Sequence, residues 1–303
     1  MKQTKKKKTS KKIFLARKVN VQVLVALLAL VLFAGLVFAF SSEHHPAATK
    51  KIIPKSSGNT AKKPLSPKPQ PKVEPQNFLP YAGIRVPILM FHHIRDPKPI
   101  KDAIGRNLSV SPEKFKADLA WLNAHNYQAI NIDDLPAIFS GKLRVTKKPV
   151  VITFDDGYED NFIEAFPDLV AAGMIGNFNI ITGAIGNPGY MTAGQLKAME
   201  RAGMEFGSHT VSHLDLATLT PVRQTEELMG SKTSLANLLG KEISSLCYPS
   251  GEYNALTIAI AKQCGYRLAT TTKFGYADAK SSALELPRVR MTESSNFNSL
   301  FQK

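Results

Sequence analysis

The sequence predicts an α/β fold over its C-terminal part, a TIM-type (β/α) barrel that is distorted or incomplete. From Ile84 onward, short apolar runs alternate with amphipathic segments, which is the pattern of a parallel sheet with helical connections. About six such units are present, which suits a barrel of this type. We divide the chain into a basic segment (1–18), a transmembrane anchor (19–40), a disordered linker (41–80) and one folded domain (81–303).

The net charge of +15 lies almost wholly in the N-terminal arm. Residues 1–80 contain 16 Lys or Arg and two acidic residues, whereas residues 81–303 contain 23 Lys or Arg and 22 acidic residues. A globular nucleic-acid-binding protein carries its basic patch on the fold itself. We therefore expect no nucleic-acid partner.

The arm has the features of a membrane anchor. The run Val19–Phe40 has no polar side chain after Gln22, and at ~1.5 Å per residue it reaches about 30 Å, the thickness of a bilayer core. Basic residues precede this run and none follows it until Lys50, which orients the N-terminus inside and the domain outside. A cleaved signal peptide is the alternative, but its apolar region is usually shorter, and residues 38–42 match a cleavage site poorly.

Residues 41–80 are rich in Pro, Lys and Ser. They contain too little apolar surface to fold, and their prolines and like charges favour an extended chain. This stretch is typical of a stalk that holds a domain away from a membrane. The sequence thus predicts a single-pass membrane protein whose domain lies on the extracytoplasmic face.

Within the domain, Ser111 is expected to cap a helix over 113–126, with Pro112 just inside it. Glycines at 173, 203 and 240 are expected to end three further helices. The predicted strands are 86–91, 150–154, 176–181, 204–207, 244–248, 266–271 and 284–290, and the other predicted helices are 161–172, 192–202, 221–239 and 256–263.

Two adjacent carboxylates, Asp155 and Asp156, end the apolar strand Val150–Phe154 and precede Gly157. Adjacent carboxylates repel each other, and a cation or a proton would relieve the pair. A helix N-cap would explain one Asp, but two at the end of an apolar strand are less expected. Because active sites of such barrels gather at the C-terminal ends of strands, this pair is a candidate site.

The segment Gly207-Ser208-His209-Thr210-Val211-Ser212-His213 also follows a strand. Two imidazoles four residues apart can bind one divalent cation. Together with Asp156 they offer two nitrogens and one oxygen, and they leave positions open for water and substrate. Histidine and carboxylate ligands suit zinc, cobalt, nickel or iron, and zinc is our expectation.

Two more strands run into polar residues. Pro87-Ile88-Leu89-Met90-Phe91 leads into His92 and His93, and histidine can act as a general acid near neutral pH. Leu246-Cys247 leads into the turn Tyr248-Pro249-Ser250-Gly251. On spacing alone, two partly exposed loop histidines explain the first segment as well as a functional role does. An ordinary strand-to-helix loop explains the second segment better than a functional turn does. Cys247 and Cys264 are expected to be separate buried thiols, although an exported protein could pair them.

Together these segments resemble the NodB-homology polysaccharide deacetylases of carbohydrate esterase family 4, over roughly residues 84–292. Thr153-Phe154-Asp155-Asp156-Gly157 and Ser208-His209-x-x-x-His213 carry the likeness, and Gly189-Tyr190-Met191-Thr192 adds to it. The His92-His93 pair near the start of the domain resembles the corresponding segment of the subgroup that deacetylates poly-β-1,6-N-acetylglucosamine.

The resemblance implies a distorted barrel and a role for each matching residue. Asp155 would be the general base, and Asp156, His209 and His213 would hold the metal. His92 would protonate the departing sugar amine, with His93 as the second candidate. The turn formed by Tyr248, Pro249, Ser250 and Gly251 would bind the substrate, and one of its backbone N–H groups would stabilise the oxyanion.

Two positions depart from the family pattern. Many members carry an Arg that steadies the base where this chain has Cys247, so Arg288 or Arg290 is expected to supply that charge. No histidine follows His213, so the late acid histidine of many members is missing.

The expected substrate is an N-acetylglucosamine polymer of the cell surface, and the protein is expected to be a monomer. Peptidoglycan is an alternative substrate, and a non-catalytic cell-wall glycan-binding domain is an alternative of another class.

Overall fold

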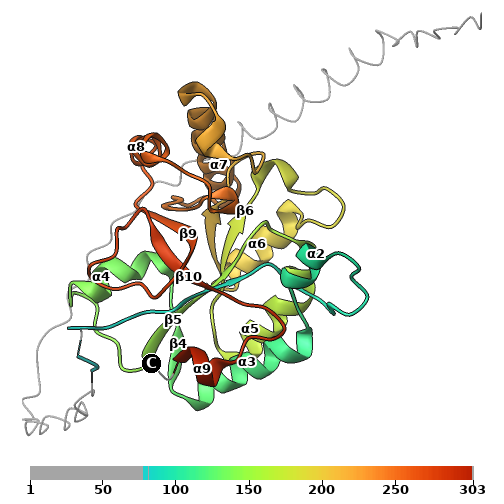
Figure 1. The fold of residues 1–303 in the computed structure, drawn as a ribbon, viewed down its shortest axis with the longest axis vertical. Coiled ribbons are helices and arrows are strands. Elements are labelled where there is room, and N and C mark those ends of the chain that lie inside the picture. Colours follow the sequence, from blue (N-terminus) through green and yellow to red (C-terminus); the bar gives the residue numbers. More distant parts are fainter. Residues whose placement is uncertain (1–77, 81, 302–303) are drawn as a thin grey trace, which may run out of the picture. The chain divides into compact units, whose positions relative to one another are not determined.

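In a computed structural model, which describes residues 78–80 and 82–301, seven parallel strands close into a barrel (Figure 1). Around the ring the order is β1, β10, β9, β8, β7, β6, β5, and β1 pairs again with β5. The prediction of a distorted or incomplete TIM-type barrel is therefore confirmed as a seven-stranded one. The ring strands are β1 (Ile88–Phe91), β5 (Lys148–Phe154), β6 (Asn177–Ile180), β7 (Glu205–Ser208), β8 (Ser245–Cys247), β9 (Leu268–Phe274) and β10 (Leu286–Arg290).

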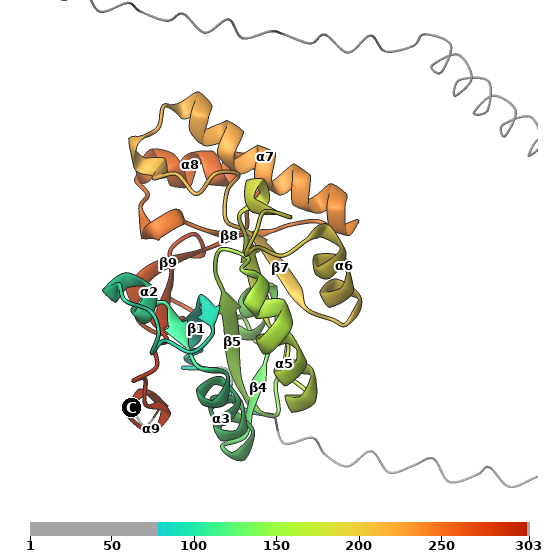
Figure 2. The ribbon, with the colours of Figure 1, turned by 90° about the vertical axis from the view of Figure 1, so that its right-hand side faces the viewer.

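Helices surround the strands, with α3 beside α5 and α7 beside α8 (Figure 2). As predicted, Ser111 accepts a hydrogen bond from the Lys114 backbone at the start of α3, and Gly173 and Gly240 adopt left-handed conformations at the ends of α5 and α7. The larger helices are α3 (Pro112–Ala124), α5 (Phe166–Ala172), α6 (Ala193–Arg201), α7 (Pro221–Leu239) and α8 (Ala255–Gln263); the short ones are α2 (Ala103–Asn107), α4 (Leu135–Phe139) and α9 (Phe297–Phe301).

The predicted helix over 161–172 is divided in two. A π-helical turn, Asn161–Ala165, precedes α5, which begins at Phe166. Pro167 follows immediately, and proline cannot donate an intrahelical hydrogen bond. The change of helical register at this point is consistent with that missing donor.

The sequence did not predict β4 (Tyr127–Ala129), which pairs with the first half of β5 while β6 pairs with its second half. Between β4 and β6, the Asn177 side chain makes hydrogen bonds to the backbone that an adjacent strand would otherwise make. Its Oδ1 accepts from the Ile132 N–H at 3.0 Å, and its Nδ2 donates to the Ile130 carbonyl at 3.2 Å. A side-chain amide thus satisfies backbone groups that a continuous ladder would have paired.

One end of the barrel is filled by apolar side chains. Leu135 and Ile138 of α4 belong to the same buried cluster as Ile88, Val151 and Leu286 from the strands. Ile88 and Leu286 are the first residues of β1 and β10, and Val151 is the middle residue of β5. The opposite end, where the strands finish, is left for polar groups.

The predicted transmembrane segment (19–40) and nearly all of the predicted linker (41–80) lie outside the described residues. Among the residues that the structure describes, no helix is long and apolar enough to cross a membrane.

Candidate metal and catalytic site

The C-terminal ends of the strands bring together the side chains that the sequence singled out. The Asp155–Asp156 pair follows β5 directly, and His209 follows β7 directly. His92 directly follows β1, and His213 lies in the loop after β7. Cys247 ends β8 and is followed by the turn Tyr248–Gly251, and Arg288 lies in β10.

Asp156, His209 and His213 form a group whose ligand atoms all lie within 4.8 Å of one another. Asp156 Oδ1 lies 3.3 Å from His209 Nε2 and 3.5 Å from His213 Nε2. His209 Nδ1 is 2.7 Å from the Cys247 carbonyl oxygen, so that ring nitrogen carries the proton and Nε2 can serve as a ligand. One carboxylate and two imidazoles in this arrangement fit a divalent cation with open coordination positions.

The charge balance at His209 also fits a cation. Burial opposes a positive charge there, but Cys247 and the hydrogen bond with Asp156 raise the pKa of His209 well above its usual value. The surroundings therefore favour a positive charge at the point where the three ligands converge.

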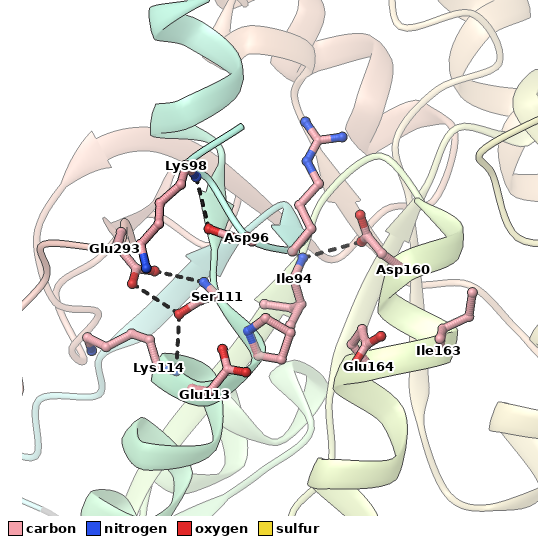
Figure 3. Close-up of a pocket in the computed structure, with 12 residues that line it drawn as sticks. Ile94, Asp96, Lys98, Ser111, Glu113, Lys114, Asp160, Ile163, Glu164 and Glu293 are labelled. Atoms are coloured by element: carbon pink, nitrogen blue, oxygen red, sulfur yellow. Dashed lines mark hydrogen bonds between the residues drawn. The ribbon is translucent and has the colours of Figure 1, made fainter. Parts of the chain in front are cut away.

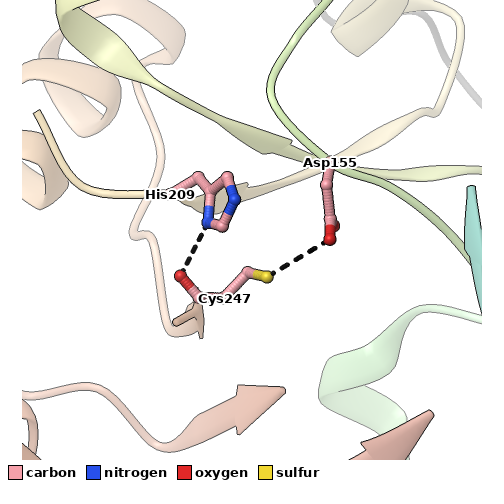
Figure 4. A group of neighbouring side chains, drawn as sticks. All are labelled: Asp155, His209 and Cys247. Carbon is pink, nitrogen blue, oxygen red and sulfur yellow. Dashed lines mark hydrogen bonds between the residues drawn. The ribbon is translucent and has the colours of Figure 1, made fainter. Parts of the chain in front are cut away.

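A second group, Asp155, His209 and Cys247, is close enough to hold an ion as well (Figure 4). Arg288 Nη2 lies 2.8 Å from Asp155 Oδ2 and 3.1 Å from Cys247 Sγ. A cation bound by Asp155 and Cys247 would lie against the guanidinium group of Arg288. Repulsion between the two positive charges makes this the weaker of the two candidate metal sites.

The backbone at the site adopts conformations that non-glycine residues seldom occupy. Of the five non-glycine residues with positive φ in the described part of the chain, four lie here: Asp156 (74°), Thr210 (65°), His213 (55°) and Ser250 (55°). Such residues cost on the order of 1–3 kcal/mol each and persist only where the surrounding structure holds them. Their concentration at one place supports its assignment as the functional site.

Asp155 is only 2 % exposed, and four donors surround its carboxylate. Arg288 donates to both oxygens at 2.8 Å, Asn179 donates to Oδ1 at 2.8 Å, and the Cys247 thiol lies 3.5 Å from Oδ2. Burial would raise the pKa of Asp155, but Arg288 holds that pKa well below its usual range. Of the two arginines considered from the sequence, Arg288 is the one in contact with Asp155, while Arg290 is exposed.

Asn179 was not singled out from the sequence, although a signal was present. The strand Asn177-Phe178-Asn179-Ile180 has polar residues at alternate positions, which places both asparagines on one face. Gly207 leaves the room that this side chain needs, because a Cβ there would lie 2.6 Å from Asn179 Oδ1.

His92 lies beside the carboxylate pair, with Nε2 3.9 Å from Asp155 Oδ2. Burial lowers the pKa of His92 to about 4, even though both aspartates act to raise it. His93 is directed elsewhere. Its Nδ1 is 2.6 Å from Asp160 Oδ2, and its ring stacks on Tyr158 with 3.6 Å between centroids.

The turn after β8 contributes through its backbone. The Tyr248 side chain is fully buried, and its hydroxyl donates to the Leu284 carbonyl at 3.1 Å, so it is not free to contact a substrate. The Tyr248 N–H donates to the Thr270 carbonyl at 3.2 Å, and Pro249 has no N–H. Ser250 is therefore the residue in this turn whose N–H remains as a candidate donor. Cys247 and Cys264 are both free and buried thiols, as expected.

One pocket adjoins this group, and another lies beside Asp160, the partner of His93. A cavity of about 390 Å³ opens beside the candidate metal ligands Asp156 and His213 and is lined also by Tyr158, Asn187 and Tyr190. A larger one, of about 810 Å³, lies next to Asp160 and is lined by charged side chains of both signs (Figure 3). Glu293 spans part of the second pocket, where it accepts hydrogen bonds from the Ser111 N–H and hydroxyl. The first pocket thus offers a small molecule direct access to the candidate metal ligands Asp156 and His213.

Comparison with known proteins places this geometry among enzymes of one kind. Residues 142–269 match the family described as Polysaccharide deacetylase. YxkH of Bacillus subtilis (strain 168), which is assigned to the polysaccharide deacetylases, is 34% identical over 208 residues, or 69% of this chain and 72% of that protein. A poly-β-1,6-N-acetyl-D-glucosamine N-deacetylase of Staphylococcus aureus (strain MRSA252) is 22% identical over 242 residues, covering 73% of this chain and 83% of that protein.

A solved structure agrees with the sequence relatives. The Streptococcus pyogenes deacetylase PplD in complex with acetate superposes with a TM-score of 0.68 at 34% identity, covering 72% of this chain and 97% of that one.

Proposed function

This chain belongs to the polysaccharide deacetylase family, and from that membership we propose that it removes N-acetyl groups from an N-acetylglucosamine-containing cell-surface polysaccharide. The observation that carries the proposal is the convergence of Asp156, His209 and His213 beside the buried Asp155. The acetate bound in the PplD structure supports acetate as the product. The name of the S. aureus relatives supports an N-acetylglucosamine polymer as the substrate.

Asp156, His209 and His213 would hold a divalent metal ion, with zinc as the expected ion and cobalt, nickel or iron as alternatives. Such an ion polarises the acetamide carbonyl and makes a water more acidic. An amide is a weak electrophile with a poor leaving group, so the reaction also needs a base and an acid from the protein.

Asp155 would act as the base. Arg288 donates to both oxygens, but the second donor to Oδ2 is only the Cys247 thiol at 3.5 Å, whereas Oδ1 also accepts from Asn179 at 2.8 Å. Oδ2, which faces His92, is therefore the oxygen better able to accept a proton from the attacking water. Arg288 and Asn179 keep the carboxylate in position. Asp155 is in this way oriented by three side chains from β6, β8 and β10.

His92 would act as the acid. Because its pKa of about 4 leaves the imidazole uncharged at neutral pH, the proton that it delivers must be taken up during the reaction. Asp155 Oδ2 lies 3.9 Å away and would pass on the proton taken from water once the two groups close to hydrogen-bond distance. That proton would then reach the departing sugar amine, while the Ser250 N–H donates to the oxyanion.

The N-terminal arm supports the further proposal of a single-pass anchor with the domain on the extracytoplasmic face. Its basic residues precede an apolar run, and none follows it until Lys50. Fractionation of cells, with protease added to intact protoplasts, would test both points. Recovery of the full chain in the cytosolic fraction would contradict them.

The decisive experiment is release of acetate from three substrates: a β-1,6-linked N-acetylglucosamine oligomer, a chitin-type oligomer and peptidoglycan. We expect release that a chelator abolishes and zinc restores. The substrate from which acetate is released fastest identifies the class of glycan on which the protein acts. The absence of acetate release from all three with the metal-loaded protein would contradict the proposal.

A further inference from the structure

The loop that carries the two histidine ligands is short and contains two strained residues. Thr210 and His213 both have positive φ, and together such residues cost on the order of 2–6 kcal/mol. From one side the loop is held by backbone contacts. Thr182 donates to the Thr210 carbonyl at 3.1 Å, and Gly183 donates to the Val211 carbonyl at 2.9 Å.

From the other side the loop is held by the carboxylate of Glu227, in the first half of α7. Glu227 is 2 % exposed, and its Oε2 accepts from the Val211 N–H at 2.9 Å and from the Ser212 N–H at 2.7 Å. Its Oε1 lies 3.7 Å from Arg223 Nη2. Hydrogen bonds from backbone N–H groups to a buried carboxylate are among the stronger ones in proteins.

The rest of α7 approaches the loop closely enough to keep Glu227 in register. A Cβ at Gly230 would lie 3.2 Å from Val211 Cγ2. Ser231 Oγ is 2.8 Å from Ser208 Oγ, which in turn accepts from the Thr210 N–H at 3.2 Å. A helix in such contact cannot slide along the loop without breaking these bonds.

We propose that Glu227 is a positioning residue that sets the affinity of the site for its metal ion by fixing the loop before His213. It does so through the N–H groups of the two residues that immediately precede this ligand. This inference rests on the proposed metal site, and it adds a residue outside the ligand set. Without Glu227, His213 would have to be ordered at the moment of binding, and that ordering would reduce affinity.

The test is titration of zinc into metal-free protein, followed by calorimetry. E227A should weaken zinc binding about 10- to 100-fold, the usual effect of removing a group that orients a ligand. E227Q keeps an oxygen acceptor of the same shape and should bind nearly as tightly as the natural protein. E226Q is the matched control, because Glu226 is the exposed neighbour that pairs with Arg223, and it should leave affinity unchanged.

Zinc affinity in folded E227A equal to that of the natural protein would overturn the proposal, whatever the change in Tm. If E227A does not fold, E227D replaces it. Its shorter side chain cannot reach both N–H groups, and we expect an intermediate loss of affinity. Natural protein that takes up no zinc, cobalt, nickel or iron would contradict the proposed metal site itself, which is a different result from equal affinity in the variant.

Discussion

Arg288 and Asp155 are 133 positions apart in the sequence, yet their side chains meet inside the barrel in two parallel hydrogen bonds of 2.8 Å. The Arg288 side chain is fully buried, and it also donates to the Thr271 carbonyl and the Thr153 hydroxyl. A buried pair with this geometry fixes both the position and the ionisation of the carboxylate. In this chain the charge that steadies Asp155 therefore comes from β10.

Replacement of Arg288 is expected to impair turnover more than metal binding. R288K keeps a charge but loses the paired geometry, and we expect kcat to fall about 10²-fold, since misplaced catalytic groups have effects of that size. Zinc affinity should change little, because Arg288 contacts none of the three proposed ligands. R290K, at an exposed position of the same strand, is the control. An R288K enzyme with unchanged kcat would remove Arg288 from the mechanism.

Metal removal should lower stability as well as activity. A ligand present at about 100 times its Kd stabilises the folded state by roughly 2.7 kcal/mol, so zinc should raise the Tm of the natural protein. In H213A one of the three ligands is lost, and both the rise in Tm and the release of acetate should largely disappear. Differential scanning calorimetry with and without zinc makes the comparison. Equal zinc-dependent shifts in both proteins would exclude His213 as a ligand.

The two neighbouring histidines are expected to differ in importance. H92Q should lower kcat about 10²- to 10⁴-fold, the usual contribution of a general acid, and leave zinc affinity intact. H93Q should have the smaller effect, because His93 is engaged with Asp160 and Tyr158 and not with Asp155. Acetate release by both variants at saturating zinc tests the ranking. The reverse order would make His93 the acid.

Gly207 should not tolerate a side chain. In G207A the added Cβ would lie 2.6 Å from Asn179 Oδ1 and 2.7 Å from Ser245 Oγ, so Asn179 would be displaced from Asp155. We expect a loss of roughly 1–3 kcal/mol in the free energy of unfolding, together with lower kcat. G194A is the control, since a Cβ there meets only the Thr192 hydroxyl at 3.9 Å. Wild-type kcat in G207A would show that Asn179 does not orient the base.

Asp118 should make stability depend on pH. Burial raises the pKa of this carboxyl to about 6, and its Oδ2 has no hydrogen-bond partner within the described structure. An unfolded Asp titrates near pH 4, so the folded state holds an extra proton between about pH 4 and 6 and loses stability as the pH rises through that range. D118N should therefore be more stable than the natural protein at pH 7.5, by about 1–2 kcal/mol, and similar to it at pH 4.

Urea unfolding at the two pH values measures this difference. E113Q, which changes an exposed carboxylate of the same helix, should show no such dependence. A constant difference between D118N and the natural protein across the range would contradict the assignment.

The sequence was sufficient to place the candidate residues at strand ends. Each apolar run is short, each ends in polar residues, and parallel strands connected by helices all finish at the same face. Asp155, Asp156, His209, His213 and His92 could thus be expected near one another. The order of strands in the ring was not needed for that expectation.

Only the tertiary structure could choose between Arg288 and Arg290. Alternate residues of a strand share a face, so both arginines of β10 meet the same condition in the sequence. Their depth in the barrel depends on how β10 is staggered against its neighbours, and closure of the seven strands sets that stagger. Arg288 is buried at the level of Asp155, while Arg290 is exposed.

The partners of Asn177, Asn179 and Glu227 also could not be assigned from the sequence, although the alternating asparagines showed that two of these residues share a face. Each acts on groups that are far away along the chain, and a polar residue within a strand or helix does not reveal its partner. The sequence by itself determined the kind of barrel and the face on which the candidate metal ligands lie. Contacts between distant segments decided how those candidate ligands and Asp155 are held, because such contacts exist only after the ring has closed.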